Sequence, residues 1–302
     1  MIIWKFNDGK PGHESQSNGL VAALNNLQEV QVIEVPSVGS MTLLFCWLFR
    51  RVPNAFPTQN PDVIIGAGRK THLPMVVAKS LCGGKTVVLM RPSLPPTLFD
   101  LIVAPEHAGV PPNDNVVEIK GVLNAVPFVA SKDTNNGLIL IGGVSSHYSW
   151  DSQAIIDQIT KIVEYDKEAS WVLTTSRRTP EDFIQLLLDC IPFDNMTVVQ
   201  FEDTDQDWMM EQFSRAGQIW VTPDSVSMVY ESLSSGAEVR VFSMDTLHPR
   251  NQSRVAKGLN DLIEQSYIST FEQWNADPSS TILTKQFNES DRVAKIVMEQ
   301  LS

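Results

Sequence analysis

A histidine that closes a glycine-rich turn is the first residue of this chain with an evident chemical use. The turn reads NDGKPGH and follows a short apolar run at residues 2–6. Imidazole has the unperturbed pKa nearest neutral pH, which suits removal of a proton from a hydroxyl group. We predict His13 and Asp8 as catalytic residues, with His13 the general base and Asp8 or Glu14 orienting its ring. The alternative is a histidine that serves only the structure of an ordinary turn.

Two turns in the first half of the chain combine glycine with cations, a composition that suits an anion. Glycine allows a tight turn and a close backbone approach, and a helix that starts after such a turn offers free N–H groups. The first turn lacks the spacing of a Walker A phosphate loop. In the second turn, GAGRKTH, solvated cations are the alternative. The candidate residues of the two turns are Gly9, Lys10, Gly12, Gly66, Gly68 and Arg69.

A third glycine-rich turn, LIGGVSSH, lies in the second half of the chain. Its candidate ligands are Gly142, Gly143, Ser145 and Ser146. Two glycines and two hydroxyls between a buried strand and the start of a helix suit a diphosphate, because backbone N–H groups there bind anions. The alternative is a simple helix cap made by Ser145, Ser146 or Ser149.

Two further turns add a cation and a carboxylate to the same half. TTSRRTP supplies Arg177, a cation suited to a diphosphate, although an exposed loop is the alternative. In TPDSVSMVYE, Asp224 or Ser225 is predicted to cap a helix that carries Glu231 about two turns inside. A carboxylate in that position accepts both hydroxyls of a ribose, although a solvated helix residue is the alternative.

The last polar cluster, HPRNQ, offers Asn251 and Gln252 as side chains that bind a sugar. The five histidines are scattered, and none has the helical spacing of a metal-ligand pair. We therefore expect no metal and no required cofactor. The groups of these turns together suit a nucleoside diphosphate sugar, and the resemblance described below makes it the expected donor substrate.

The elements that must position these turns alternate in type. Apolar runs such as residues 63–65 and 138–141 alternate with helical periodicity, as in residues 155–163. This pattern is typical of parallel βαβ units, in which ligands bind at the carboxyl ends of the strands. The small, polar stretch 125–137 interrupts the pattern and predicts a domain boundary. The expected fold is α/β, with two Rossmann-like, doubly wound parallel sheets.

Charge and cysteine usage narrow the partners and the location. Asp and Glu number 35 against 23 Lys and Arg, for a formal net charge of −12, which argues against nucleic acid as a partner. The three cysteines stand far apart and are predicted to be reduced core residues. The N-terminal residues lack the pattern of a signal peptide, so a cytoplasmic protein is expected. The sequence does not determine the oligomeric state.

One apolar block, MTLLFCWLFRR at residues 41–51, raises the question of a membrane. Its apolar part is about half the length of a spanning helix. Trp47 and the two arginines at its end are typical of an interfacial anchor, which would place the protein at the inner face of the cytoplasmic membrane. The alternative is a helix buried against the first sheet.

Taken in order, these turns resemble the landmarks of the GT-B glycosyltransferases, especially the lipid-linked N-acetylglucosaminyl transferase of peptidoglycan synthesis. DGKPGHESQ, TTSRRTP and TPDSVSMVYE are more similar to an uncharacterised bacterial family related to a plant mitochondrial fission factor (elongated mitochondria). Both resemblances imply a GT-B-like fold whose two domains face a cleft. Two departures from the transferase pattern are Pro11 inside the first turn and Asp224 in place of a hydroxyl residue.

The transferase resemblance implies an acceptor-side domain at residues 1–127, completed by a returning C-terminal helix at 286–302, and a donor domain at 136–285. It places the candidate residues of the first two turns on the acceptor side. The implied activity is metal-independent transfer of a sugar to an unknown acceptor, with a lipid-linked acceptor as one option. The plant relatives imply an alternative, a non-catalytic nucleotide-binding or recruiting module. A nucleotide-sugar 2-epimerase, which shares the fold, is the third option.

Overall fold

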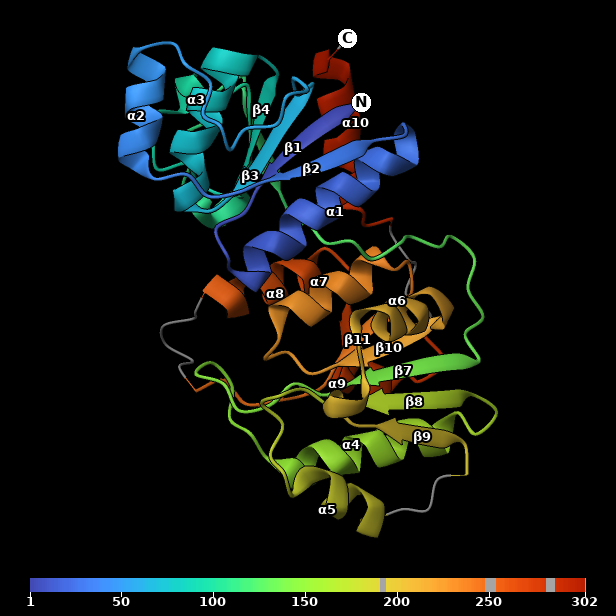
Figure 1. Cartoon of the computed structure of the whole chain (residues 1–302). Coiled ribbons are helices and arrows are strands. Elements are labelled where there is room, and N and C mark those ends of the chain that lie inside the picture. The colour runs from blue at the N-terminus through green and yellow to red at the C-terminus, as the bar shows by residue number, and fades with distance from the viewer. Residues whose placement is uncertain (191–193, 248–253, 281–285, 302) are drawn as a thin grey trace. The chain divides into compact units, whose positions relative to one another are not determined.

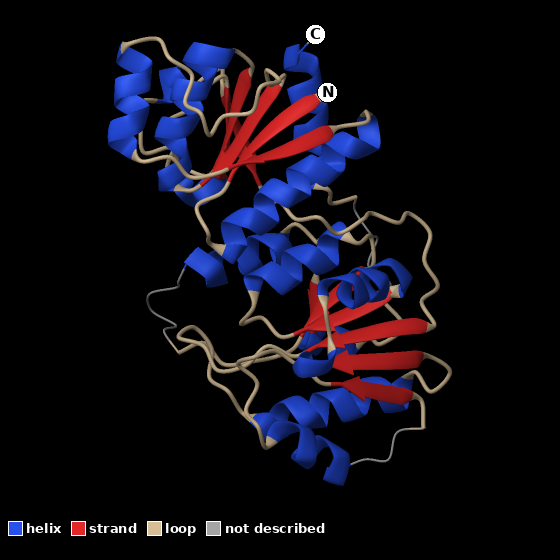
Figure 2. Ribbon diagram, in the orientation of Figure 1, coloured by secondary structure: helices blue, strands red, loops and turns tan. Residues whose placement is uncertain are grey.

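The chain divides into two compact units, each built around its own parallel sheet. The computed structural model describes residues 1–190, 194–247, 254–280 and 286–301 (Figure 1). The first unit comprises Met1–Ala125 and Asn288–Ser302, and the second comprises Val126–Phe287. The predicted domains are residues 1–127 with 286–302, and residues 136–285. In both units the strands lie inside and the helices surround them (Figure 2).

Six parallel strands form the sheet of the first unit, in the order β2-β1-β3-β4-β5-β6. The central strands consist almost wholly of buried residues, as expected for a parallel sheet covered on both faces. The strands are β1 (Ile2–Phe6), β2 (Gln31–Val35), β3 (Val63–Ala67), β4 (Lys85–Leu89), β5 (Leu101–Pro105) and β6 (Val116–Ile119). The helices are α1 (Pro11–Leu27), α2 (Ser40–Leu48), α3 (His72–Cys82) and α10 (Glu289–Leu301), with short 3₁₀ turns η1 (Arg69–Thr71), η2 (Pro96–Leu98) and η3 (Glu106–Ala108).

Helix α10 completes the first unit from the far end of the chain. Its Val293 and Val297 join Leu20 and Leu24 of α1 in one fully buried apolar cluster. The Ser290 hydroxyl donates to the carbonyl oxygen of Asn124 at 2.7 Å, which fixes the helix to the end of the unit's first segment. The expected returning C-terminal helix therefore supplies one wall of the first core.

The second unit also has six parallel strands, in the order β12-β11-β10-β7-β8-β9. The strands are β7 (Asn136–Leu140), β8 (Ser170–Thr174), β9 (Met196–Val199), β10 (Gln218–Val221), β11 (Glu238–Val241) and β12 (Ser269–Thr270). The helices are α4 (Ser152–Tyr165), α5 (Phe183–Cys190), α6 (Gln206–Arg215), α7 (Val226–Ser234), α8 (Arg254–Glu264) and α9 (Phe271–Ala276), with one 3₁₀ turn, η4 (Phe201–Asp203). Trp171 and Trp220 fill the core under α4 and α9.

The strand orders place a switch point in each sheet. Numbered within its own unit, the second sheet runs 3-2-1-4-5-6 from β9 to β12, the strand order of dinucleotide-binding folds. The direction of winding reverses between β7 and β10 there, and between β1 and β3 in the first sheet. In open parallel sheets, ligands bind outside the carboxyl ends of the strands at such a point.

The predicted alternation of strands and helices is confirmed, with ends shifted by a few residues. The prediction of three core cysteines is wrong for one of them. Cys46 is buried and Cys82 is partly buried, but Cys190 is exposed. Cys190 is the last residue of α5, a short helix whose buried side chains are Phe183 and Leu187. Its spacing from Phe183 and Leu187 places it on the same face of the helix, but at the end of the helix it is left exposed, which a generally apolar context does not reveal.

Candidate functional site

The switch point of the first unit holds an aspartate–histidine pair. Nδ1 of His13 lies 2.9 Å from Oδ2 of Asp8, and both side chains are largely buried. Asp8 follows β1, whereas His13 is the third residue of α1, which begins at Pro11. Proline suits that first helical position because its missing N–H would have no partner inside the helix. The structure thus identifies Asp8, and not Glu14, as the residue that orients the ring.

The hydrogen bond to Asp8 determines what the imidazole can do. A carboxylate only accepts hydrogen bonds, so Nδ1 of His13 carries the proton and donates it. The neutral ring then has Nε2 free of a proton, as a general base requires. Nε2 of His13 has no hydrogen-bond partner within the described ranges of the chain. The geometry of the pair therefore suits proton removal by Nε2.

Gly68 provides the space in which this pair lies. It follows β3, adopts φ of +92°, and would place a Cβ 2.3 Å from Oδ2 of Asp8 and 2.4 Å from Nδ1 of His13. Gly66 is similarly enclosed, since a Cβ there would lie 2.6 Å from the sulfur of Met75. Close packing therefore explains why glycine occupies both positions, whether or not an anion binds there. Lys10, Gly9, Gly12 and Arg69 are exposed at the same sheet edge.

A second histidine, His72, lies close to the pair and was not among the predicted site residues. Its Nδ1 accepts the backbone N–H of Ser93 at 3.0 Å, and the Ser93 hydroxyl lies 2.7 Å from the same nitrogen. Burial lowers the pKa of His72, while the charge of Asp8 raises it to a smaller extent. The buried Nε2 has no partner within the described residues. In GAGRKTH, the two cations suggest an anion site, and nothing in the motif predicts the surroundings of His72. Its ring is bonded to Ser93, which follows β4 and is distant in the sequence.

The switch point of the second unit is occupied by a carboxylate. The Gly143 N–H donates to Oδ2 of Asp224 at 3.0 Å, and a guanidinium nitrogen of Arg178 lies 2.8 Å from the same oxygen. The Gly142 N–H donates to the Thr222 hydroxyl at 2.7 Å. The Asp224 side chain is fully buried, and its Oδ1 has no partner within the described residues. The amides predicted to bind a diphosphate are thus already bonded within the protein.

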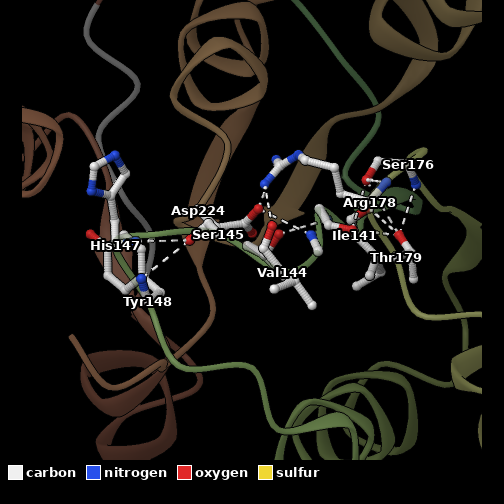
Figure 3. Close-up of polar contacts among 12 residues, drawn as sticks. Ile141, Val144, Ser145, His147, Tyr148, Ser176, Arg178, Thr179 and Asp224 are labelled. Carbon is white, nitrogen blue, oxygen red and sulfur yellow. Dashed lines mark hydrogen bonds and ion pairs between the residues drawn. The ribbon is translucent and has the colours of Figure 1, made fainter. Parts of the chain in front are cut away.

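The turn after β8 holds the glycine loop in place (Figure 3). The Ser176 hydroxyl donates to the carbonyl oxygen of Gly142 at 2.8 Å, and the Thr179 hydroxyl bonds to the same oxygen. Arg178 also donates to the carbonyl oxygen of Val144 at 3.2 Å. A Cβ on Gly143 would lie 2.0 Å from the Arg178 carbonyl oxygen, so the close approach of the two turns requires glycine.

The predicted helix start at residues 142–146 is wrong. Helix α4 begins at Ser152, and the Asp151 carboxylate caps it by accepting the Ala154 N–H at 3.0 Å. The Ser145 hydroxyl instead accepts the backbone N–H groups of His147 and Tyr148, both at 3.2 Å. Between the loop and the helix, Tyr148 forms an isolated antiparallel bridge with Thr246. Ser146, next to Ser145, is exposed.

The two adjacent arginines of the TTSRRTP turn have different surroundings. The guanidinium of Arg177, the residue predicted to contact phosphate, lies 5.7 Å from the centre of the Phe201 ring. Its neighbour Arg178 makes the ion pair with Asp224. A dipeptide of like residues gives no signal for which one turns inward, so sequence reasoning missed Arg178.

Helix α7 starts directly after Asp224. Ser225 occupies the N-cap position, but its side chain makes no capping hydrogen bond, and Asp224 is directed to Gly143 instead. The prediction that either side chain caps this helix is therefore wrong. Glu231 lies inside α7, where burial raises its pKa to about 7. Its carboxyl group thus titrates near neutral pH.

Two predicted residues cannot be placed with the others. Asn251 and Gln252 lie outside the described residues. Within the described ranges, no three His, Cys, Asp or Glu side chains gather closely enough to hold a metal ion.

Two parallel sheets, each with helices on both faces and a switch point, define the fold of GT-B proteins with two Rossmann-like domains. The UDP-GlcNAc 2-epimerase of Methanocaldococcus jannaschii shares it, with a TM-score of 0.56 over 99% of this chain and 100% of that one at 10% identity. MurG of Acinetobacter baumannii has a TM-score of 0.52 over 99% of both chains at 12% identity. The predicted GT-B fold is confirmed.

The chain belongs to the family described as mitochondrial fission ELM1, whose sequence model matches residues 11–301. An uncharacterised protein of Rickettsia prowazekii (strain Madrid E) is 22% identical to it over 98% of each chain. The predicted relationship to the fission family is therefore confirmed as well.

Proposed function

We propose that the chain binds a nucleoside diphosphate sugar through its second unit and acts as a metal-independent glycosyltransferase. One observation supports the proposal: the segments that follow β7 and β10, the strands on either side of the switch point in a sheet with the dinucleotide-binding strand order, contain three groups suited to such a ligand. They are the exposed Ser146, the uncapped start of α7, and the titratable Glu231.

The start of α7 is the part best suited to phosphate. The first N–H groups of a helix have no acceptor inside it, and the helix dipole adds a partial positive charge at the same end. Because no side chain caps α7, these groups are available to an anion. Ser225 and Ser227 add hydroxyls there, and Arg177 is exposed on the neighbouring turn.

Glu231 is the proposed ligand of the ribose. An ionised carboxylate accepts two hydroxyl hydrogen bonds, and such bonds favour the charged form. The pKa of about 7 means that the unliganded carboxyl group is partly protonated near neutral pH. Ribose binding should therefore release a proton. Asn251 and Gln252 remain the proposed sugar contacts.

The first unit supplies the proposed base. Asp8 holds Nδ1–H of His13, so Nε2 can accept a proton from an acceptor hydroxyl while the carboxylate stabilises the resulting imidazolium. The donor side needs no proton transfer in this scheme, because helix N–H groups and an arginine offset the charge on the leaving diphosphate. The exposed residues of the first two turns, Lys10 and Arg69, are the proposed acceptor-side cations.

Asp224 favours a second candidate, a non-catalytic nucleotide-binding or recruiting module. Its carboxylate takes the Gly143 N–H and an Arg178 N–H, two groups that would otherwise be offered to phosphate. A diphosphate would also lie near this negative charge, which Arg178 offsets. This arrangement costs donor affinity, which a module that only senses or recruits can tolerate.

Calorimetry with UDP, GDP and ADP is the direct test of the proposed binding. We expect one nucleotide to bind, and Glu231→Gln to weaken its binding, while Glu211→Gln serves as a matched control because Glu211 is exposed and paired with Arg215 on α6. If none of the three nucleotides binds the unaltered protein, the donor site is refuted.

Incubation with UDP-GlcNAc, the sugar nucleotide named for one of the structural neighbours, then separates the activities. Release of UDP that depends on an added acceptor supports the transferase. Free ManNAc with UDP, formed without an acceptor, supports a 2-epimerase. Binding without turnover of any sugar nucleotide supports the non-catalytic module.

A further inference from the structure

The most apolar exposed surface within the described residues lies on α2 and the turn that follows it. Seven large apolar side chains are exposed there: Met41, Leu44, Phe45, Trp47, Leu48, Phe49 and Val52. Met41 is 81% exposed and Leu48 is 73% exposed, values unusual for such residues. We call these seven residues the α2 patch. Contiguous apolar surface of this kind on a soluble fold marks a site of interaction.

The helix is held to the first unit by its other side. Leu43 and Cys46 are the buried residues of α2, and Leu43 packs in the core beneath the sheet with Met75 of α3. The Trp47 indole N–H donates to the Ser80 hydroxyl at 3.2 Å, so the ring lies along the surface with its polar edge bonded. The predicted alternative, a helix buried against the first sheet, is wrong for most of its residues. Two positions anchor the helix, and the rest of its apolar surface faces outward.

The end of the helix fixes two cations beside the patch. The Arg51 N–H donates to the Cys46 carbonyl oxygen at 2.8 Å, and the Arg50 N–H to that of Trp47 at 3.3 Å, which is the pattern of a Schellman turn. Arg50 occupies the left-handed position of that turn, with φ of 52°, where glycine is the usual residue. A strained arginine in that place is better explained by a use for its charge than by the turn itself.

The surroundings of the patch are free of negative charge along the chain. No Asp or Glu occurs between Glu34 and Asp62, although the protein has 35 acidic residues and a net charge of −12. Glu34 pairs with Lys5 at 2.7 Å, and Asp62 accepts the Ile2 N–H. Neither Arg50 nor Arg51 has an ion-pair partner within the described part of the chain.

We propose that the α2 patch binds the surface of an anionic lipid bilayer. Leu48, Met41 and the exposed aromatic rings enter the boundary between headgroups and acyl chains, and the two arginines contact the anionic headgroups. The α2 patch matches such a bilayer in two respects. Its apolar side chains suit the acyl chains, and the two arginines beside it suit the anionic headgroups. None of the helices within the described residues is long and apolar enough to cross a bilayer.

Vesicle flotation tests the proposal with the full chain. The vesicles are made of phosphatidylcholine with or without phosphatidylglycerol, at low and at high salt. We expect flotation with the anionic vesicles at low salt and its loss on substitution Leu48→Glu. Leu188→Glu is the matched control, because Leu188 is 55% exposed on a helix of the second unit, and it should float like the unaltered protein. Removing both charges with Arg50→Gln and Arg51→Gln should weaken binding roughly 30-fold, at about fivefold per cation near an anionic surface.

The proposal is wrong if the unaltered protein fails to float with anionic vesicles. It is also wrong if the Leu48→Glu variant floats equally well. A third contrary result is a dimer, seen by light scattering, that Leu48→Glu dissociates while no vesicle binding occurs, since the patch would then join two copies. If Leu48→Glu fails to fold by circular dichroism, the arginine variant and the salt dependence decide, because neither alters the apolar packing.

Discussion

The two switch points use the same residue type in opposite ways. In the first unit, Asp8 follows β1 and reaches the space left by Gly68 after β3. In the second unit, Asp224 follows β10 and reaches the space left by Gly142 after β7. Asp8 meets an imidazole, which can gain or lose a proton, whereas Asp224 meets an arginine and a backbone amide, which cannot. The first site therefore pairs its carboxylate with a group that can take up a proton, whereas the second holds a fixed ion pair.

The largest expected effect tests the proton-transfer side of this comparison. His13→Ala should reduce turnover about 10²–10⁴-fold, the usual contribution of a general base, and should leave nucleotide binding unchanged. Asp8→Asn should lower the rate by a smaller factor, because the ring would lose its fixed tautomer. Glu14→Gln is the control and should have full activity. Full activity in His13→Ala would remove the proposed base.

Alanine substitutions at Gly143 and Gly68 should show that the second site is rigid and that the first can adjust. Gly143→Ala should destabilise the protein by about 3 kcal/mol, because the new Cβ would collide with the backbone of the neighbouring turn. Gly68→Ala meets side-chain atoms of Asp8 and His13, which can shift, although its positive φ adds strain. We expect a smaller loss of stability there and a larger loss of activity. Urea unfolding and turnover measure both, and an equal loss of stability would contradict the contrast.

Removal of the fixed charge should trade stability for affinity. Asp224→Ser deletes charge-assisted bonds to Gly143 and Arg178, at a cost of about 1.5–3 kcal/mol of unfolding free energy. The freed N–H groups should then bind phosphate, so the affinity for the nucleotide should rise. Calorimetry measures the affinity, at temperatures chosen so that the variant and the unaltered protein are equally stable. Weaker nucleotide binding in this variant would mean that the carboxylate helps to hold the ligand.

The smallest expected effect is a pH dependence confined to the second unit. Because the pKa of Glu231 is about 7, the ionised form that binds ribose increases with pH, and affinity should rise about tenfold from about pH 6 to about pH 8. Since the folded-state pKa lies above the unfolded value, the free protein also loses stability as the pH rises from the unfolded pKa through about 7. Glu231→Gln should abolish both trends in calorimetry and thermal unfolding. Persistence of the affinity trend in that variant would assign it to another group.

Local patterns made much of the fold and the first site predictable. Alternation of apolar runs with helical periodicity identifies parallel βαβ units, and tight turns mark the carboxyl ends of the strands. Asp8 and His13 lie five residues apart across one such turn, so a short stretch of sequence contains both partners. The sequence alone does not show whether Asp8 or Glu14 bonds to the ring, because the direction of the His13 side chain depends on where α1 begins.

The second site depends on contacts between residues far apart in the sequence, and no local motif predicts such contacts. Asp224 and Gly143 are 81 residues apart and meet only because β7 and β10 are neighbours in the sheet. Tyr148 pairs with Thr246, and α4 starts only at Ser152 behind its Asp151 cap, which nothing near residue 142 signals. Local cap preferences therefore gave the wrong helix start there.

The return of α10 to the first unit has a consequence for the order of folding. During synthesis, the second unit is a continuous segment and has all of its strands before α10 is made. The first segment of the first unit emerges earlier but lacks the wall formed by Val293 and Val297 until α10 has left the ribosome. The part made first should therefore become protease-resistant last. Pulsed proteolysis of stalled nascent chains that end before and after α10 would show this reversal, and early protection of the first unit would contradict it.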